Sequence, residues 1–373
     1  MNAMESTERD ESIQPILDAV LDGRRLTTDE AVRLLESPDL ASLARAAHTI
    51  RQRLHPGNVV TYIIDRNVSY TNVCIAYCKF CAFYRPPGSE EGYTLSKQEL
   101  FQKIEETIAL GGTGILMQGG LNPYLKIDFY EDLLRSIKQR YAIHLHCLSP
   151  AEIVHIAKVS KLSVREVIRR LKAAGLDSIP GGGGEVLHDE IRRRINRRLT
   201  SDEWLNAMRI AHQEGLPTTA TMVIGLGETA WHRAVHLERL RELQDETGGF
   251  TAFIHWVYQP DNTELGKNGW PKASAMEYLK MLAVARLYLD NIPHLQTSWL
   301  TVGYETAQKG LHCGADDFGS IIIEENVVTA AGVPRIYPTE QKVRRLIREA
   351  GFQPQQRDTL YRPVTNRRVA NVP

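Results

Sequence analysis

Three of the five cysteines lie close together in the segment CIAYCKFC, residues 74–81. Cys74, Cys78 and Cys81 follow a C-x3-C-x2-C spacing, whereas Cys147 and Cys313 lie far along the chain. A disulfide uses two thiols, and a structural zinc site usually uses four ligands. Thiolates at this density suit iron–sulfur or zinc chemistry. Three protein ligands on a four-iron cluster would leave one iron open to a substrate or cofactor.

Composition excludes several classes of protein. The 373 residues contain 45 Lys and Arg and 45 Asp and Glu, so the net charge is zero and we expect no nucleic-acid partner. No apolar run approaches the roughly 20 residues of a membrane span, so we expect no membrane partner. The first residues are polar and acidic, unlike a secretory signal. We therefore expect a cytoplasmic protein, in which an odd number of reduced cysteines points to metal binding or catalysis.

The chain divides into four predicted parts. Residues 1–12 resemble a disordered tail, and residues 13–60 contain three short helical patterns that would form an N-terminal cap. Residues 61–320 alternate between strand and helix patterns. Residues 321–373 form a C-terminal extension, in which TEQKVRRLIREAG predicts one helix and the end shows no periodicity.

The alternating region predicts an α/β fold, a (β/α)8 TIM-type barrel. Roughly eight strand–helix steps occur between residues 62 and 319, and a helix after each strand favours parallel strands. A doubly wound sheet is the rival, but the chain lacks a dinucleotide fingerprint. The strands are expected at residues 59–70, 113–120, 142–149, 176–185, 218–228, 250–260, 294–303 and 315–319. Helix starts are marked by capping boxes at Thr27 and Glu30, Ser96 and Glu99, Ser149 and Glu152, and Thr200 and Glu203.

The cysteine segment carries a family resemblance. Phe80 precedes Cys81, and C-x3-C-x-aromatic-C resembles the motif of the radical S-adenosylmethionine (SAM) enzymes. The resemblance implies a [4Fe-4S] cluster held by Cys74, Cys78 and Cys81, with SAM on the open iron as the second cofactor. Reduction of the cluster would cleave SAM to methionine and a 5′-deoxyadenosyl radical. The alternative interpretation of the cysteines is a structural zinc knuckle or a chance cluster of thiols.

Other motifs imply contacts with SAM. MQGG supplies Gln118, Gly119 and Gly120 at the end of the second strand, where the family receives the SAM amino group. The remaining residues that the resemblance implies as cofactor contacts are Glu185 in GGGGE, and Val223 and Gly225 in TMVIGLGE. Thr221 stands where that last motif has its first glycine, which leaves the adenine contact open.

Longer segments resemble the menaquinone and deazaflavin branch of the family, among them QPDNTEL and GADDFGSIIIEENVVTAAG. The similarity is strongest to the cyclases of the futalosine route to menaquinone. It implies dehypoxanthine futalosine as the small-molecule substrate, hydrogen abstraction at ribose C4′, and ring closure onto the benzoate. It also implies a reducing electron donor such as flavodoxin or ferredoxin. Aminofutalosine synthase and a deazaflavin (F0) synthase component are the alternatives, and an iron–sulfur electron carrier is the non-enzyme alternative.

Ring closure releases a proton, so the sequence should supply a base at the barrel mouth. Asp317 and Glu324, near the end of the last strand, and His255, late in the sixth, are the candidates. Packing of the histidine and ordinary turn acids are the alternative interpretations. His144 and His146 share one face of the third strand and either line the interior or pack in the core. Trp256 and Tyr258 either line the wall for an aromatic substrate or belong to the core. Asp316 and Glu325 are either substrate contacts or ordinary turn acids. We expect the basic run IRRRINRR, residues 191–198, to be a solvated face.

Overall fold

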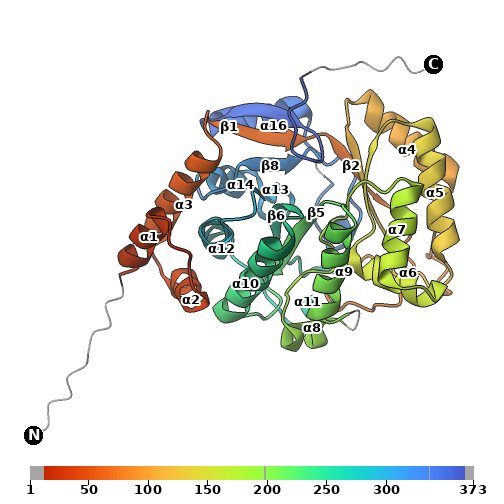
Figure 1. The fold of residues 1–373 in the computed structure, drawn as a ribbon, viewed down its shortest axis with the longest axis horizontal. Coiled ribbons are helices and arrows are strands. Elements are labelled where there is room, and N and C mark those ends of the chain that lie inside the picture. The colour runs from red at the N-terminus through yellow and green to blue at the C-terminus, as the bar shows by residue number, and fades with distance from the viewer. Residues whose placement is uncertain (1–11, 197–198, 336, 366–373) are drawn as a thin grey trace, which may run out of the picture.

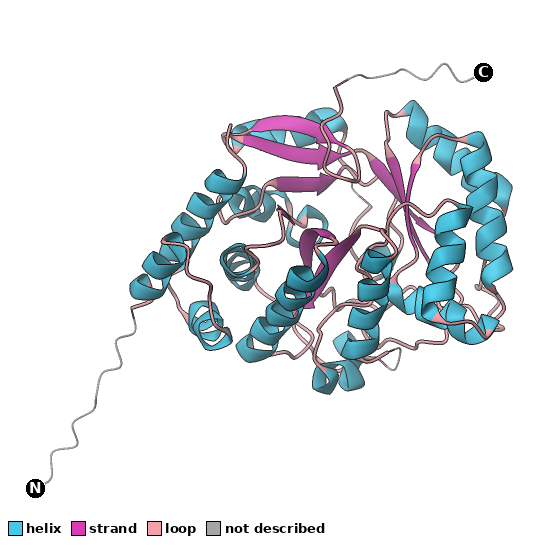
Figure 2. Cartoon of the chain, in the orientation of Figure 1, coloured by secondary structure: helices cyan, strands magenta, loops and turns pink. Residues whose placement is uncertain are grey.

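The computed structural model describes residues 12–196, 199–335 and 337–365. These residues form a (β/α)8 barrel of the TIM type, as predicted, with parallel strands inside and helices around them (Figures 1 and 2). The strands are β1 (Val59–Ile63), β2 (Asp65–Ser69), β3 (Gly114–Gln118), β4 (His144–Cys147), β5 (Thr218–Ile224), β6 (Phe250–Val257), β7 (His294–Gln296), β8 (Asp317–Ser320) and β9 (Gln353–Arg357).

The strand pairings of the described residues form a ring. β2 pairs with β3 and β3 with β4, while β5, β6, β7 and β8 follow one another and β8 returns to β1. Two bridges, His146 to Ser178 and Ile179 to Thr218, join β4 to β5 through the short segment between them. β1 and β2 are two halves of one strand, separated by Ile64. Eight strand positions therefore surround the interior, in agreement with the eight predicted steps.

The sequence does not predict β9, which lies in the C-terminal tail. It pairs in parallel with β1, so that Val59 stands opposite Gln353 and Ile63 opposite Arg357. This edge of β1 is open because β3 pairs with β2 and not with β1. The tail is thus built into the barrel wall between β1 and the start of β3.

The helices cover the outside of the strands (Figure 2). Those that follow barrel strands, with their short neighbours, are α4 (Lys97–Ala109), α5 (Ile127–Arg140), α6 (Pro150–Ser160), α7 (Val164–Ala174), α8 (Asp189–Ile195), α9 (Ser201–Gln213), α10 (Ala230–Thr247), α11 (Glu264–Lys267), α12 (Ala275–Tyr288), α13 (Trp299–Val302), α14 (Tyr304–Leu311), α15 (Val327–Ala330) and α16 (Glu340–Glu349). The predicted capping boxes at Thr27, Ser96, Ser149 and Thr200 are all formed.

Three helices precede the barrel: α1 (Gln14–Leu21), α2 (Thr28–Glu36) and α3 (Leu40–Leu54). α2 packs against α10 and α12, and α3 packs against α12, at the left of Figure 1. The boundaries between the four predicted parts stay a prediction, and the predicted disordered tail falls, apart from Ser12, outside the described residues. Among the described helices, none is long and apolar enough to cross a membrane.

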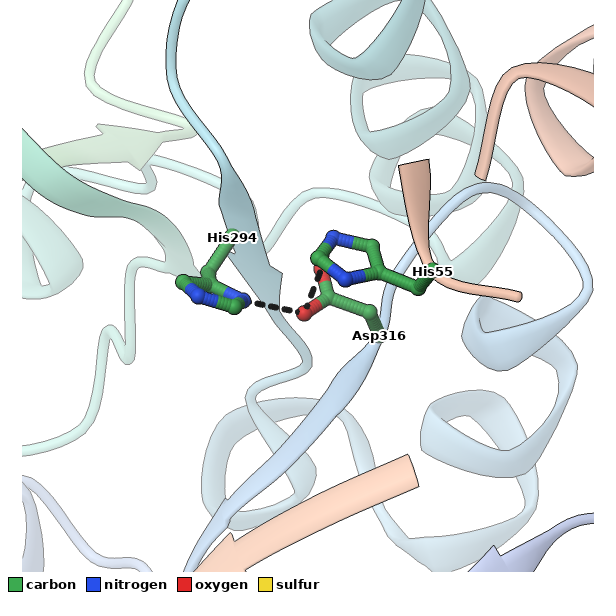
Figure 3. Close-up of side chains that lie close together, drawn as sticks. All are labelled: His55, His294 and Asp316. Carbon is green, nitrogen blue, oxygen red and sulfur yellow. Dashed lines mark hydrogen bonds and ion pairs between the residues drawn. The ribbon is translucent and has the colours of Figure 1, made fainter. Parts of the chain in front are cut away.

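A polar cluster stands at the start of β7 and β8 (Figure 3). His294 donates from Nδ1 to Asp316 at 2.6 Å, and Arg286 donates to the other carboxylate oxygen at 2.6 Å. His55, which ends α3, lies 3.4 Å from Asp316. Although burial alone would raise it, the His294 hydrogen bond and the Arg286 charge lower the pKa of Asp316 to about 2. Asp316 is therefore a structural acid, at the end of the strands remote from the cysteines.

Candidate functional site

A cavity of about 420 Å³ occupies the barrel interior. Strand β1–β2 lines it with alternate residues from Ile63 to Ser69, which fits the twofold repeat of a strand. Ile63 pairs with Arg357 of β9, and Ser69 pairs with Gln118 of β3. The cavity therefore runs from the C-terminal strand up to the cysteine loop, which follows Ser69 directly. Its volume lies within the usual range for small-molecule sites.

Cys74, Cys78 and Cys81 all line the upper end of this cavity, together with Phe80. The backbone N–H groups of Ala76 and Leu121 donate to Sγ of Cys74 at 3.4 and 3.2 Å. Such hydrogen bonds stabilise a thiolate and tune an iron–sulfur cluster.

The spacing of the thiols distinguishes a cluster from zinc. Two thiolates on one zinc ion, each about 2.3 Å away, stand at most about 4.6 Å apart. Within the described part of the chain, the three Sγ atoms are not all within 4.8 Å of one another. The donor set therefore fits a cluster, in which each thiolate binds a different iron, better than a zinc knuckle.

The predicted MQGG residues lie beside the cysteines. Gln118, Gly119 and Gly120 all line the cavity. A Cβ on Gly120 would come within 2.3 Å of the Val73 carbonyl oxygen, so the close approach to the cysteine loop requires glycine. The N–H of Gly119 donates to buried Glu152 at 2.9 Å. The turn is thus fixed by packing and by a buried carboxylate.

The other residues predicted to contact SAM divide into two groups. Glu185 and Val223 line the cavity, as does Thr221, whose hydroxyl donates to the Gly181 carbonyl at 2.6 Å. Gly225 does not line the cavity. Its N–H donates at 2.9 Å to Glu228, whose side chain is fully buried, so this part of the motif holds a turn.

The three predicted catalytic residues lie outside the cavity lining. Asp317 is completely buried, and its carboxylate accepts two hydrogen bonds from Arg357, at 2.6 and 2.9 Å, and one from Thr61 at 2.5 Å. A carboxylate occupied in this way has no oxygen directed at a substrate. Asp317 therefore closes the barrel wall, contrary to the expectation of a substrate contact.

His255 and Glu324 are also engaged elsewhere. His255 is completely buried, stacks on Tyr278 and bonds through Nε2 to its carbonyl at 3.1 Å. Burial lowers the pKa of His255 to about 3. Glu324 forms ion pairs with Lys103 at 2.7 Å and Arg66 at 3.6 Å. The alternative interpretations, a packed histidine and a turn acid, describe these two residues.

Asp65 is an interior acid that the sequence interpretation missed. It lines the cavity, and burial raises the pKa of its carboxyl despite a hydrogen bond from Ser320. The alternation of Ile63, Asp65 and Asn67 along the first strand is the signal that could have revealed it. By contrast Glu325, which also lines the cavity, accepts backbone N–H groups at the start of α15 and is structural.

Other cavity residues come from β4, from β6 and the residue after it, and from the C-terminal tail. His146 lines the cavity and bonds through Nδ1 to Ser178 at 2.6 Å, whereas His144 does not line it. Trp256 and Tyr258 line it, as does Tyr361 from the tail. Burial lowers the pKa of His146 to about 3, so its ring is neutral.

The basic run IRRRINRR is only partly solvated. Ile191, Arg192 and Ile195 are buried, and Arg192 donates to the carbonyl of Gly183 in the glycine loop at 2.9 Å. Arg192 therefore supports the cavity wall, while Arg197 and Arg198 lie outside the described residues.

Comparisons with known proteins agree with this site. Residues 68–240 match the radical SAM superfamily, and residues 247–369 match the CofH/MqnC C-terminal region. The chain is 51% identical to a cyclic dehypoxanthine futalosine synthase of Halalkalibacterium halodurans, over 94% of each chain. It is 45% identical to one of Streptomyces coelicolor, over 94% of this chain and 88% of that one. Identity to an aminodeoxyfutalosine synthase of Thermus thermophilus is 39%, over 95% of this chain and 97% of that one.

Solved structures share the fold. Methylornithine synthase (PylB) has a TM-score of 0.71 at 20% identity, over 92% of this chain and 97% of that chain. HydG, a maturase of the [FeFe]-hydrogenase, has a TM-score of 0.73 at 16% identity, over 94% and 76%. The chain therefore belongs to the radical SAM enzymes, whose cofactors are a [4Fe-4S] cluster and SAM, and within them to the family that includes the cyclic dehypoxanthine futalosine synthases.

Proposed function

We propose that this protein is a radical SAM cyclase that converts dehypoxanthine futalosine to cyclic dehypoxanthine futalosine in the futalosine route to menaquinone. The observation that carries the proposal is the 51% identity to a synthase of that name over 94% of both chains. The identity to aminodeoxyfutalosine synthase, 39%, is lower over a similar length.

We propose that Cys74, Cys78 and Cys81 ligate the cluster, and that Gln118, Gly120, Glu185 and Val223 surround SAM. Together the two cofactors supply a 5′-deoxyadenosyl radical. The support is that all of these residues line one cavity. The protein contributes position and exclusion of water.

The substrate belongs in the lower cavity, between the SAM residues and β9. Removal of the C4′ hydrogen leaves a carbon radical, which forms a bond to a carbon of the benzoate ring. The ring then loses one proton and one electron to recover aromaticity, and the cluster, oxidised by the cleavage of SAM, would accept that electron. Trp256 and Tyr258 offer apolar surface to such a ring.

We propose Asp65 as the acceptor of the ring proton. Its carboxyl stands in the interior, where burial moves its pKa upward from the usual range of a carboxylic acid. A base works best when its pKa approaches the working pH, and the raised pKa serves this purpose. Asp317, Glu324 and His255 lack access to the cavity and are not part of the proposal.

We further propose that a reduced flavodoxin or ferredoxin supplies the electron, in the cytoplasm. The cluster loop reaches the surface, where Ile75 and Tyr77 are 40% and 53% exposed beside Cys74 and Cys78. Lys79 lies in the same loop, where its amine pairs with Glu264 at 3.4 Å.

The proposal is tested by offering the reduced, cluster-loaded enzyme and SAM two substrates in separate reactions. Dehypoxanthine futalosine should be consumed to a cyclised product, with 5′-deoxyadenosine as co-product. An enolpyruvyl benzoate should remain unchanged. Consumption of the enolpyruvyl benzoate, with the adenosyl group in the product, would assign the aminofutalosine synthase activity instead.

A further inference from the structure

A second group of potential metal ligands lies away from the barrel interior. His188 is the N-cap of α8, Glu190 lies in the first turn of α8, and His232 lies in the first turn of α10. One ligand atom from each of the three lies within 4.8 Å of the other two. The cluster therefore joins the first turns of two neighbouring helices.

Two nitrogens in this cluster are buried without a hydrogen-bond partner. They are Nδ1 of His188 and Nε2 of His232, and the two rings are 4.7 Å apart between centroids. A buried polar atom without a partner costs about 1–3 kcal/mol, and native structures contain few of them. His232 is 8% exposed, so water does not readily replace the missing partner.

The carboxylate is arranged to complete the group. One oxygen of Glu190 accepts a hydrogen bond from Arg194, while the other lies 3.6 Å from Nε2 of His232. The second oxygen therefore faces the unpartnered Nε2 of His232. Imidazole nitrogen and carboxylate oxygen are the ligands that zinc accepts besides thiolate.

We propose that His188, Glu190 and His232 bind a divalent transition-metal ion such as Zn²⁺, with water as the fourth ligand. Nδ1 of His232 lies 2.8 Å from the hydroxyl of Thr229. In the structure the backbone N–H of Thr229 also donates to Nδ1, at 3.2 Å, in the capping box of α10. Binding of the ion at Nε2 would move the ring proton to Nδ1, which would then donate to the Thr229 hydroxyl in place of this capping hydrogen bond. Metal-bound histidines commonly make a second hydrogen bond of this kind.

The group at the start of β7 and β8 has the same kinds of ligand but lacks the same property (Figure 3). His55 bonds through Nε2 to the Pro293 carbonyl at 2.8 Å, and His294 donates to Asp316 at 2.6 Å. Arg286 occupies the remaining carboxylate oxygen and brings a positive charge. These groups satisfy one another, so the group of His55, His294 and Asp316 serves as an internal control.

The ion would tie α8 to α10 and thereby stabilise the glycine loop. Arg192 of α8 donates to the carbonyls of Gly183 and Val186, on either side of Glu185. Ordering of the first turn of α8 thus extends to the cavity wall. The ion is a structural clip and takes no part in the radical reaction.

The test uses tag-free, cluster-loaded enzyme dialysed against Zn²⁺, with zinc and iron per chain measured by mass spectrometry. The wild type should hold one zinc beyond its iron. His188→Gln and Glu190→Gln should each weaken zinc binding at least about tenfold, and the double variant should lose it. His294→Gln should keep the zinc.

Iron content serves as the folding and cluster control, and Glu190→Gln alters a half-exposed side chain that tolerates change. The zinc-loaded wild type should also unfold at a higher temperature than the zinc-free form, and the double variant should show no such shift. Absence of zinc from the wild type would overturn the proposal. So would retention of zinc in the double variant, or its loss in His294→Gln.

Discussion

Arg357 and Asp317 form a two-point ion pair between β9 and β8, with donor–acceptor distances of 2.6 and 2.9 Å. Both side chains are almost completely buried. The pair joins the C-terminal tail to the last strand of the barrel, at the lower end of the cavity. The tail is therefore a structural part of the site.

Replacing Arg357 by Leu should destabilise the protein by about 3–5 kcal/mol, because Asp317 would remain buried without its partner. Urea unfolding followed by circular dichroism measures the change. Arg362→Leu is the matched control, since its pair with Asp358 is exposed and should contribute about 0–1 kcal/mol. Equal stability of the two variants would contradict the structural role of β9.

Local signals in the sequence predicted much of the fold, and non-local contacts explain what was missed. The capping boxes depend on residues three apart, so Ser96 and Glu99 could be read directly. β9 forms because this part of the tail pairs with the open edge of β1, almost 300 residues earlier in the sequence. No periodicity within the tail predicts this pairing, because the stability of a strand depends on the strands and side chains that pack against it.

The same distinction separates the two parts of the site. The three cysteines of residues 74–81 and the two glycines of MQGG lie in short motifs, and in the structure they line one cavity. Asp317 was expected to face a substrate from the end of its strand. Its carboxylate instead forms an ion pair with Arg357, which lies 40 residues later in the sequence. Asp65 was missed although its neighbours alternate, because a strand position alone does not reveal which face is the interior.

Replacement of a cluster cysteine should abolish SAM cleavage. Cys78→Ala should lose the four-iron EPR signal and most of its iron, because two thiolates hold the cluster poorly. Cys313→Ala is the control. Cys313 is a buried thiol whose pKa burial raises to about 11, so it is not a thiolate ligand and its loss should leave iron content unchanged. An intact, SAM-cleaving cluster in Cys78→Ala would refute the ligand assignment.

Asp65→Asn should slow product formation by about 10²–10⁴ if Asp65 accepts the ring proton. SAM binding, followed by the change it causes in the cluster EPR spectrum, should be retained, and KM should change little. Glu324→Gln provides a control outside the cavity and should turn over at the wild-type rate. Normal turnover in Asp65→Asn would transfer the role to another interior group.

Stability should fall in acid through buried histidines such as His255. Burial lowers the pKa of His255 from 6.5 to about 3, so between these values the unfolded chain binds a proton that the folded chain does not. The free energy of unfolding therefore decreases as the pH falls below 6.5. His255→Phe should reduce this slope by up to about 1.4 kcal/mol per pH unit, as urea unfolding at several pH values would measure. An unchanged slope would show that His255 is protonated in the folded state.

The adenosyl radical should act at ribose C4′ of dehypoxanthine futalosine, and deuterium at that carbon tests this most directly. The reduced enzyme and SAM are supplied with this substrate, and the nucleosides are analysed by mass spectrometry. A cyclase should yield 5′-deoxyadenosine that carries the deuterium and a cyclised product that lacks it. Deuterium that remains on the substrate, with 5′-deoxyadenosine unlabelled, would contradict the proposed reaction.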